Sequence, residues 1–432
     1  MRIAVVGSGI SGLASAWLLS RRHEVWLFEA NNYLGGHTHT HEVAQQDLSY
    51  RIDTGFIVHN PRHYPLFAQF LGQLGVQSQP TTMSFSVHNE ATGLEYNAAT
   101  LDTLFCQRIN LLSPRFIGMV RDLMRFYREA PELLGQHDNN ASLGDYLRQH
   151  RYGAAFRDEH LLPMASALWS SPPAQILNFP ARYLVQFMAN HQMLQVNDRP
   201  QWRVVQGGSS AYVQALRARW PVRERLNCPV RSVRRHAQSV EVQSAAGVEH
   251  FDQLVLACHS DQALAMLADA DHREQSILGA ITYQANDAVL HTDSRLLPVG
   301  RKAWAAWNAW LPRDPNQSCT VSYCMNLLQG VESPDPFVVT LNRTAAIDPD
   351  KILRRMNYRH PVYTRDSVAA QARKAEIQGQ RRTWFAGAYW GWGFHEDGLR
   401  SAVAVAHALG ERWPAESAPV HEVEAQEREI AA

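Results

Sequence analysis

The pattern of apolar and polar residues at the start of the chain predicts a compact strand and helix unit. Residues 3–6 and 25–28 are continuous apolar runs, which are typical of strands buried on both faces. Residues 10–22 between them have the apolar spacing of a helix. Two parallel strands joined by a helix form a βαβ unit, so we expect that unit within residues 2–29.

Further along the chain, helical and strand patterns alternate in blocks. Helical spacing covers 63–75, most of 101–190, 209–219 and 397–409. Strand patterns cover a hairpin at 83–96 with its turn at 89–93, short strands at 230–257, longer strands at 280–345 and a short strand at 383–387.

The order of these blocks predicts an α/β fold in which one Rossmann-like nucleotide-binding domain is assembled from three separate segments. We assign residues 1–80, 203–270 and 378–413 to this domain. An α+β substrate domain then takes residues 81–202 and 271–377. Residues 414–432 have no aromatic residue and little periodicity, and we expect a flexible tail there.

Composition narrows the classes of partner. Lys plus Arg and Asp plus Glu both number 41, so no overall charge draws the chain to nucleic acid or to anionic lipid. The five cysteines are odd in number and have no CxxC spacing, which argues against disulfides and zinc and favours a reducing compartment. No signal peptide and no run of about 18 apolar residues is evident. We therefore expect a cytoplasmic protein that binds no nucleic acid.

One helical segment leaves membrane contact open. Phe116, Val120, Leu123 and Tyr127 fall on one stripe, with arginines on the other sides. Such a helix suits either the core of the substrate domain or a peripheral contact with a membrane surface.

The clearest chemical signal is Gly7-Ser8-Gly9-Ile10-Ser11-Gly12, which follows a predicted strand and opens a predicted helix. In a dinucleotide fingerprint the first glycine permits the turn, the second lets a pyrophosphate approach the backbone, and the third allows close packing of helix and strand. The helix N-terminus offers free N–H groups to the phosphates. A glycine turn without a ligand is the alternative.

Glu29 supports the nucleotide interpretation. It ends the second predicted strand and follows Gly12 by 17 residues. An acid at this place accepts hydrogen bonds from a ribose hydroxyl and repels a 2′-phosphate, which argues against NADP. The alternative is a solvated glutamate at a strand end.

A second glycine pair follows in Leu34-Gly35-Gly36-His37-Thr38. With the first loop and Glu29, it resembles the flavin superfamily of amine oxidases, protoporphyrinogen oxidase and phytoene desaturase. In that superfamily an arginine follows the glycine pair and binds phosphate, and here His37 takes its place. A histidine titrates near pH 6.5, whereas an arginine is always charged, so a nearby phosphate would favour protonated His37.

The resemblance extends through most of the chain. It includes Asp53-Thr54-Gly55-Phe56, Gly207-Gly208-Ser209, Pro229-Val230, Ala386-Gly387-Ala388 and Gly393-Phe394-His395-Glu396-Asp397-Gly398-Leu399. In the superfamily, the last stretch starts a helix whose N-terminus faces the flavin and stabilises its reduced anion. The resemblance implies FAD, held non-covalently, by Gly7, Gly9, Ile10, Ser11, Gly12, Glu29, Ala30, Asn31, Gly35, Gly36, His37, Thr38, Gly55, Phe56, Val230, Ala257, Gly387, Glu396, Asp397, Gly398 and Leu399.

These motifs, together with Met83 to Val87, are most similar to a bacterial family known as predicted NAD/FAD-binding flavoproteins. A related domain lies at the N-terminal side of plant cyclopropane fatty-acyl synthases. By analogy, the resemblance implies an unsaturated or modified fatty-acyl chain as substrate, and a lipid-modifying enzyme as a partner.

For the catalytic centre, we select His395, Tyr389 and Trp392, because the superfamily places this loop beside the flavin ring. Aromatic walls exclude water, and a histidine titrates near neutral pH. Core packing of the aromatic residues is the alternative. His59, Asn60 and Tyr64 form a second candidate group.

Two more specific interpretations, amine oxidation and zinc binding, have less support in the sequence. Related amine oxidases place a lysine beside flavin N5, but the three lysines here are Lys302, Lys351 and Lys374, and the strand 286–291 has none. His37, His39 and His41 would share one face of a strand and could hold zinc, but no supporting carboxylate is evident, and we expect no metal.

The predicted function is therefore an FAD-dependent oxidoreductase that moves a hydride from an apolar substrate to flavin N5. The alternatives are a flavin amine oxidase and a non-catalytic flavin-binding partner of a lipid-modifying enzyme.

Overall fold

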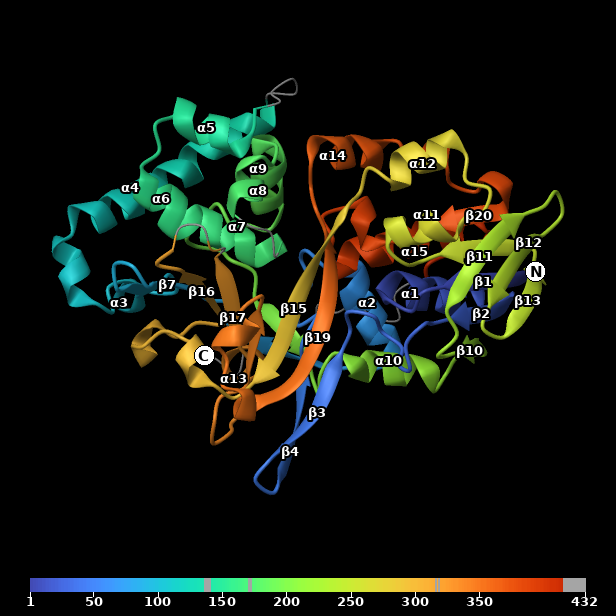
Figure 1. Cartoon of the computed structure of the whole chain (residues 1–432), viewed down its shortest axis with the longest axis horizontal. Helices are drawn as coiled ribbons and strands as arrows, with labels where there is room; N and C mark the ends of the chain where they lie inside the picture. Colours follow the sequence, from blue (N-terminus) through green and yellow to red (C-terminus); the bar gives the residue numbers. More distant parts are fainter. Residues whose placement is uncertain (136–140, 170–172, 315–316, 318, 415–432) are drawn as a thin grey trace.

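The structure is a computed structural model that describes residues 1–135, 141–169, 173–314, 317 and 319–414. One half of the fold is built on a five-stranded parallel sheet, at the right of Figure 1. Its order is β10 (Arg223–Arg225), β2 (Glu24–Phe28), β1 (Arg2–Val6), β14 (Gln253–Leu256) and β20 (Thr383–Phe385). The helix α1 (Ile10–Leu19) joins β1 to β2, which confirms the predicted βαβ unit.

The central strand β1 is buried on both faces, as its continuous apolar run predicted. Ile3 and Val5 pack into a core with α1, α2 (Pro65–Leu74), α10 (Ser210–Arg217) and α15 (His395–Ala408). Ala4 and Val6 face the other way, onto the antiparallel sheet β11 (Val230–Arg235), β12 (Val240–Ser244) and β13 (Gly247–Phe251). Because side chains alternate along a strand, two separate cores meet at this one sheet.

The strands of this sheet come from three separate parts of the chain. β1 and β2 belong to the first 28 residues, β10 and β14 to residues 223–256, and β20 to residues 383–385. These are the three segments that we assigned to the nucleotide-binding domain, and the exact domain boundaries stay a prediction.

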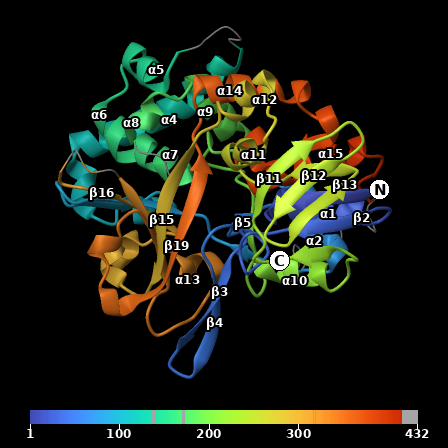
Figure 2. The same cartoon turned by 45° about the vertical axis from the view of Figure 1, so that its right-hand side comes forward.

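The other half of the fold is built on a seven-stranded mixed sheet. Its order is β19 (Ile352–Pro361), β15 (Tyr283–His291), β18 (Val338–Leu341), β17 (Thr320–Cys324), β16 (Trp307–Leu311), β7 (Phe85–Asn89) and β8 (Leu94–Asn97). β7 and β8 form the predicted hairpin. The paired strands β15 and β19 lie between the nucleotide-binding half and the helical layer (Figure 2).

A helical layer covers one side of the seven-stranded sheet, at the upper left of Figure 1. It contains α3 (Leu101–Leu104), α4 (Pro114–Glu129), α5 (Leu143–Gln149), α6 (Ala154–Phe156), α7 (Leu162–Trp169), α8 (Pro173–Leu177) and α9 (Ala181–Asn190). α4 begins where the Ser113 hydroxyl accepts the Phe116 N–H and Pro114 occupies the first turn. Its predicted stripe packs into the core of this layer.

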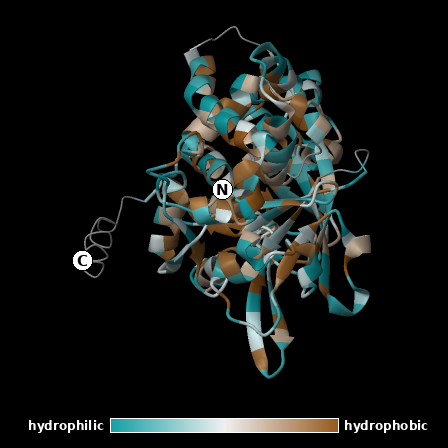
Figure 3. Ribbon diagram, turned by 90° about the vertical axis from the view of Figure 1, so that its left-hand side faces the viewer, coloured by the Kyte–Doolittle hydropathy of each residue, from teal (hydrophilic) through white to brown (hydrophobic). Residues whose placement is uncertain are grey.

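Smaller elements connect the halves. A hairpin of β3 (Thr40–Gln45) and β4 (Leu48–Asp53) extends from the body of the molecule (Figure 3), and β5 (Val58–His59), β9 (Trp202–Val205) and β6 (Ser78–Thr81) form a short sheet. The remaining helices are α11 (Ser260–Met266), α12 (His272–Leu278), α13 (Met325–Gln329) and α14 (Arg365–Ala372).

α15 begins at His395, two residues before the predicted start, because the Asp397 carboxylate accepts the Phe394 N–H and completes the first turn. The predicted tail lies outside the described residues from 415 onward. Within the described part of the chain, no helix combines the length and the apolar character needed to cross a bilayer.

Candidate functional site

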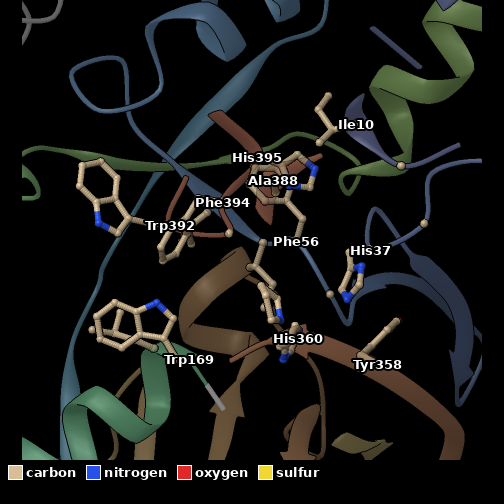
Figure 4. A pocket seen from close by; sticks show the side chains of 18 of the residues that line it. Ile10, His37, Phe56, Trp169, Tyr358, His360, Ala388, Trp392, Phe394 and His395 are labelled. Atoms are coloured by element: carbon tan, nitrogen blue, oxygen red, sulfur yellow. The ribbon is translucent and has the colours of Figure 1, made fainter. Parts of the chain in front are cut away.

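A cavity of about 1220 Å³ lies between the two halves of the fold. It starts at the carboxyl ends of β1, β2 and β14, where parallel α/β sheets bind their ligands. From there it extends past β19 to α7 and α9 in the helical layer. Figure 4 shows side chains from both halves that point into it.

The first glycine loop has the geometry that close approach of a ligand requires. Gly7 has φ +98°, and a Cβ added to Gly12 would lie 1.8 Å from the Gly7 carbonyl oxygen, so neither position accepts a larger residue. A Cβ added to Gly9 would meet nothing within 4 Å. Gly9 therefore presents bare backbone to open space at the N-terminus of α1, as a pyrophosphate site needs.

Glu29 ties the end of β2 to this loop. One carboxylate oxygen accepts the backbone N–H of Ser8 at 3.0 Å and its hydroxyl at 2.6 Å. The other accepts the backbone and side-chain N–H groups of Asn31 at 2.9 and 2.8 Å. The carboxylate thus has a fixed position at the cavity wall, where a ribose hydroxyl would reach it.

The second glycine pair packs directly on the first loop. The Gly35 N–H donates to the Ser8 carbonyl at 3.0 Å. A Cβ added to Gly36, which has φ +58°, would lie 3.1 Å from the Gly9 Cα. A Cβ added to Gly55 would lie 2.2 Å from the His37 carbonyl oxygen. The three segments are therefore held together by contacts that only glycine permits.

His37, which follows the pair, is half-buried beside two other imidazoles. Its ring centre lies 5.3 Å from that of His360 and 6.1 Å from that of His259. Burial lowers the pKa of His37 and of His259 to about 4, and that of His360 to about 3. All three are therefore neutral near pH 7 in this structure.

The N-terminus of α15 reaches the cavity at His395, and the two acids that follow it bind backbone N–H groups elsewhere. The Glu396 carboxylate accepts the N–H groups of Leu66 and Phe67 at 3.1 Å each, so it caps α2. The Asp397 carboxylate accepts the N–H groups of Trp392 and Phe394. The first-turn N–H groups of α15 remain the part of this segment that can face a flavin.

His395 lines the cavity but is closely packed. Its ring stacks on Phe56 with 3.5 Å between ring centres, and Nε2 lies 3.0 Å from the Thr38 hydroxyl and 3.3 Å from the Tyr212 hydroxyl. Burial lowers the pKa of His395 well below its ordinary value. The imidazole is therefore neutral, and its acid–base role stays a prediction.

Aromatic rings form the wall of the cavity on the side of the helical layer. Phe187 lies 4.7 Å from Trp169 and stacks on Phe394 at 5.2 Å between ring centres. Trp392 packs beside Phe187 at 6.2 Å. Figure 4 shows Trp169, Trp392 and Phe394 on one side of the cavity and His37, Tyr358 and His360 on the other. This wall suits an apolar ligand and excludes water.

Charged groups are few along the cavity. Of the described residues that line it, Glu29 is the one carboxylate, and no lysine lines it. Arg359 is paired with Asp261 at 2.7 Å. Arg199 lies beside Tyr127 near the helical layer. The part of the cavity away from Glu29 therefore has no anionic group among the described residues to bind a cation.

Most of the predicted site residues come together here. His395, Tyr389 and Trp392 line the cavity, as do Gly7, Gly9, Ile10, Ser11, Glu29, Ala30, Asn31, Gly35, Gly36, His37, Gly55, Phe56, Val230, Ala257 and Gly387. Behind the wall lie Gly12, Thr38, Glu396, Asp397, Gly398 and Leu399. Of the second candidate group, Tyr64 lines the cavity, whereas His59 and Asn60 do not.

Sequence reasoning missed His259, Tyr358 and His360. His259 follows the end of β14, and the rule that ligands bind at the carboxyl ends of parallel strands could have found it. Tyr358 and His360 share one face of β19, and nothing local in the sequence indicates what that face contacts.

A family model described as flavin containing amine oxidoreductase matches residues 10–297, about two thirds of the chain. AofH of Mycobacterium tuberculosis, named as a flavin-containing monoamine oxidase, is 27% identical over 256 residues, which are 57% of this chain and 54% of that protein. The chain thus spans about half the length of the curated relatives it matches.

Solved structures with the same fold belong to proteins that are named for different substrates. A putrescine oxidase has a TM-score of 0.70 at 14% identity, covering 95% of this chain and 99% of that chain. A fatty acid isomerase from P. acnes that produces CLA has a TM-score of 0.67 at 16% identity, covering 95% and 98%. At these identities the likeness concerns the fold, and it does not select a substrate.

Proposed function

Since the chain belongs to the flavin-containing amine oxidoreductase family and its cofactor is FAD, we propose that it oxidises an apolar substrate, with an acyl chain as the first candidate. When bound, FAD supplies a hydride acceptor. The substrate would lose a hydride from carbon and a proton from the neighbouring atom, which leaves a C=C or C=N bond.

The residues described above would hold FAD along the cavity. The open backbone at Gly9 and the N-terminus of α1 suit its pyrophosphate, and Glu29 suits its adenosine ribose. None of the free cysteines is suggested by the sequence as an attachment point, and we propose a non-covalent cofactor.

The observation that carries the substrate proposal is the aromatic wall in a part of the cavity that lacks carboxylates and lysines. Trp169, Phe187, Trp392 and Phe394 offer apolar surface, and the neighbouring His191 is neutral because burial lowers its pKa to about 4. An alkyl ammonium would lose its hydration in such a wall without gaining a partner charge. An acyl chain loses little and gains contact area.

Arg199 adds a preference of charge. Arg199 is an exposed residue that lies beside Tyr127 at the end of the cavity near the helical layer, and its Nε donates to the Gln195 carbonyl at 3.0 Å. A cation there repels an ammonium and attracts a carboxylate or a phosphate head group. This supports an acyl lipid as the substrate class.

Amine oxidation is the second candidate, and the family match and the name of AofH favour it. It differs from acyl oxidation in the substrate that would reduce the flavin. A flavin-binding partner of a lipid-modifying enzyme is the remaining proposal.

The test is anaerobic mixing of the flavin-loaded protein with each substrate class, followed by the flavin absorbance. We expect phospholipids with unsaturated or modified acyl chains to bleach the flavin and alkyl amines to leave it oxidised. Bleaching by amines alone would reject acyl oxidation and support amine oxidation. If neither class bleaches it, and a lipid-modifying enzyme gains activity on addition of the protein, the partner role is supported instead.

A further inference from the structure

Three histidines from separate elements meet at the cavity wall beside the first glycine loop. His37 follows the second glycine pair, His259 follows β14, and His360 lies in β19. Their ring centres are 5.3 Å apart for His37 and His360 and 6.1 Å apart for His37 and His259. We call these residues the histidine cluster.

Two nitrogens of the cluster are buried without a partner. The Nε2 atom of His37 and the Nδ1 atom of His259 make no hydrogen bond in this structure. The third member is better satisfied, because His360 Nδ1 lies 3.2 Å from the Asn286 side-chain nitrogen. Buried polar atoms without partners are rare and costly, so the unpartnered nitrogens indicate that a ligand completes the cluster.

The backbone next to the cluster contacts the loop that we assign to the pyrophosphate. Gly36 precedes His37 and packs on Gly9. A Cβ added to Gly36 would lie 3.1 Å from the Gly9 Cα. Ala257, two residues before His259, packs on Gly7. A Cβ added to Gly7 would lie 2.9 Å from the Ala257 carbonyl oxygen. His37 and His259 are therefore fixed close to the N-terminus of α1.

The charges around the cluster leave room for an anion. The other titratable groups that face it are Tyr33, His39, Cys258, Asp261, Tyr283, Tyr358, Arg359 and His395. Among them the one carboxylate is Asp261, and Arg359 holds it at 2.7 Å. The one carboxylate among the described residues that line the cavity is Glu29, and its two oxygens accept hydrogen bonds from Ser8 and Asn31.

We propose that the histidine cluster, with His37 as the contact residue, binds the pyrophosphate of FAD and takes up a proton when it does so. The proposal rests on FAD as the cofactor, and it concerns binding rather than the substrate.

The direction of the pH dependence follows from the charge of the imidazoles before FAD binds. The imidazoles are neutral there near pH 7, since burial depresses their pKa values to about 3 to 4. A bound pyrophosphate carries negative charge and raises the pKa of the imidazole that it contacts. FAD affinity therefore increases as pH falls from about 8 to about 6, by about tenfold for one proton.

The experiment measures FAD binding to the apoprotein by flavin fluorescence at about pH 6 and about pH 8, and proton uptake by calorimetry in two buffers of different ionisation enthalpy. We expect about tenfold tighter binding at the lower pH and uptake of up to about one proton per FAD. His37→Gln should abolish both effects. His37→Arg should bind FAD with little change between the two pH values, because a guanidinium stays charged.

His272→Gln is the matched control, because His272 is exposed and does not line the cavity. It should keep the wild-type pH dependence. Equal affinity of the wild type at both pH values, or an unchanged pH dependence in His37→Gln, would overturn the proposal while leaving FAD as the cofactor. If His37→Gln fails to fold, the pH profile of His37→Arg decides. A wild-type protein that binds no FAD at any pH would instead reject the cofactor assignment.

Discussion

At the scale of single residues, the Glu29 carboxylate both stabilises the glycine loop and lies at the expected ribose site. It anchors Ser8 in the glycine loop and Asn31 after β2, and it lies where a ribose would bind. We predict that Glu29→Ala weakens FAD binding by about 10-fold or more, since a charge-assisted hydrogen bond contributes about 1.5–3 kcal/mol. The release of FAD when the loaded protein is diluted measures this loss of affinity.

Glu24→Ala provides the control for that prediction. Glu24 lies on the same strand, at the exposed end, and pairs with Arg223 at 3.0 Å. It should leave FAD release unchanged. Equal release from wild type and Glu29→Ala would contradict the assigned role of Glu29.

The difference between Glu29 and His360 shows what the sequence can predict at this scale. Glu29, Gly7 and Gly9 belong to one local unit, whose spacing carries the geometry. His360 lies 323 positions after His37 in the chain, and their contact depends on how β19 crosses the cavity. A single sequence holds no signal for such a contact.

At the scale of elements, the start of α2 depends on a residue of α15. The Glu396 carboxylate accepts the N–H groups of Leu66 and Phe67 in the first turn of α2. We predict that Glu396→Ala lowers the free energy of unfolding by about 1–2 kcal/mol, as loss of a helix cap does. Urea unfolding measures the loss.

Glu396→Gln tests whether capping is the cause, because an amide oxygen can still accept one of these hydrogen bonds. It should recover part of the stability. If both variants are as stable as the wild type, the cap contributes nothing.

The sequence alone could not show that the Glu396 side chain caps α2, although we predicted a cofactor role for this residue. The motif correctly predicts a helix there, but it does not show which element lies opposite each side chain. The Glu396 side chain faces α2, and Glu396 does not line the cavity. The same applies to Asp397, whose carboxylate binds its own loop.

At the scale of the whole molecule, buried histidines couple stability to pH. Burial lowers the pKa values of His59, His160, His191 and His291 to about 4, below the 6.5 of an unfolded chain. The unfolded state then binds more protons between pH 6.5 and 4, so stability decreases as pH falls through this window.

We predict that the apoprotein loses stability steeply between pH 7 and pH 5, by up to about 1.4 kcal/mol per pH unit for each such histidine. Urea unfolding at these two pH values measures the effect. A stability that is equal at both, or higher at pH 5, would show that the imidazoles are not neutral in the folded protein.

Several exposed aliphatic side chains lie on the outer surface of the helical layer. They are Leu101, Ile109, Leu111, Leu112, Ile117 and Met124, and Arg108, Arg115, Arg121 and Arg128 belong to the same segment. Leu112 is 80% exposed and Ile109 71% exposed. Apolar side chains among arginines suit the interface of an anionic membrane.

We predict that the protein co-sediments with vesicles of acidic phospholipid and that salt weakens this binding. Ile109→Glu with Leu112→Glu should abolish it. Leu48→Glu is the control, because Leu48 is 61% exposed on the separate hairpin of β3 and β4. Equal sedimentation of all variants, or none for the wild type, would reject the membrane contact.

The origin of the five-stranded sheet in three segments has a consequence for biosynthesis. β1 and β2 are made well before β20, residues 383–385, which pairs with β14 at one edge of the same sheet, and α15, which packs on α1, follows β20. A nascent chain therefore exposes an unfinished sheet edge and an open nucleotide cradle until β20 and α15 have been made. Flavin capture then has to wait until α15 has been made, and a chain interrupted before β20 would be left without its cofactor and exposed to proteolysis.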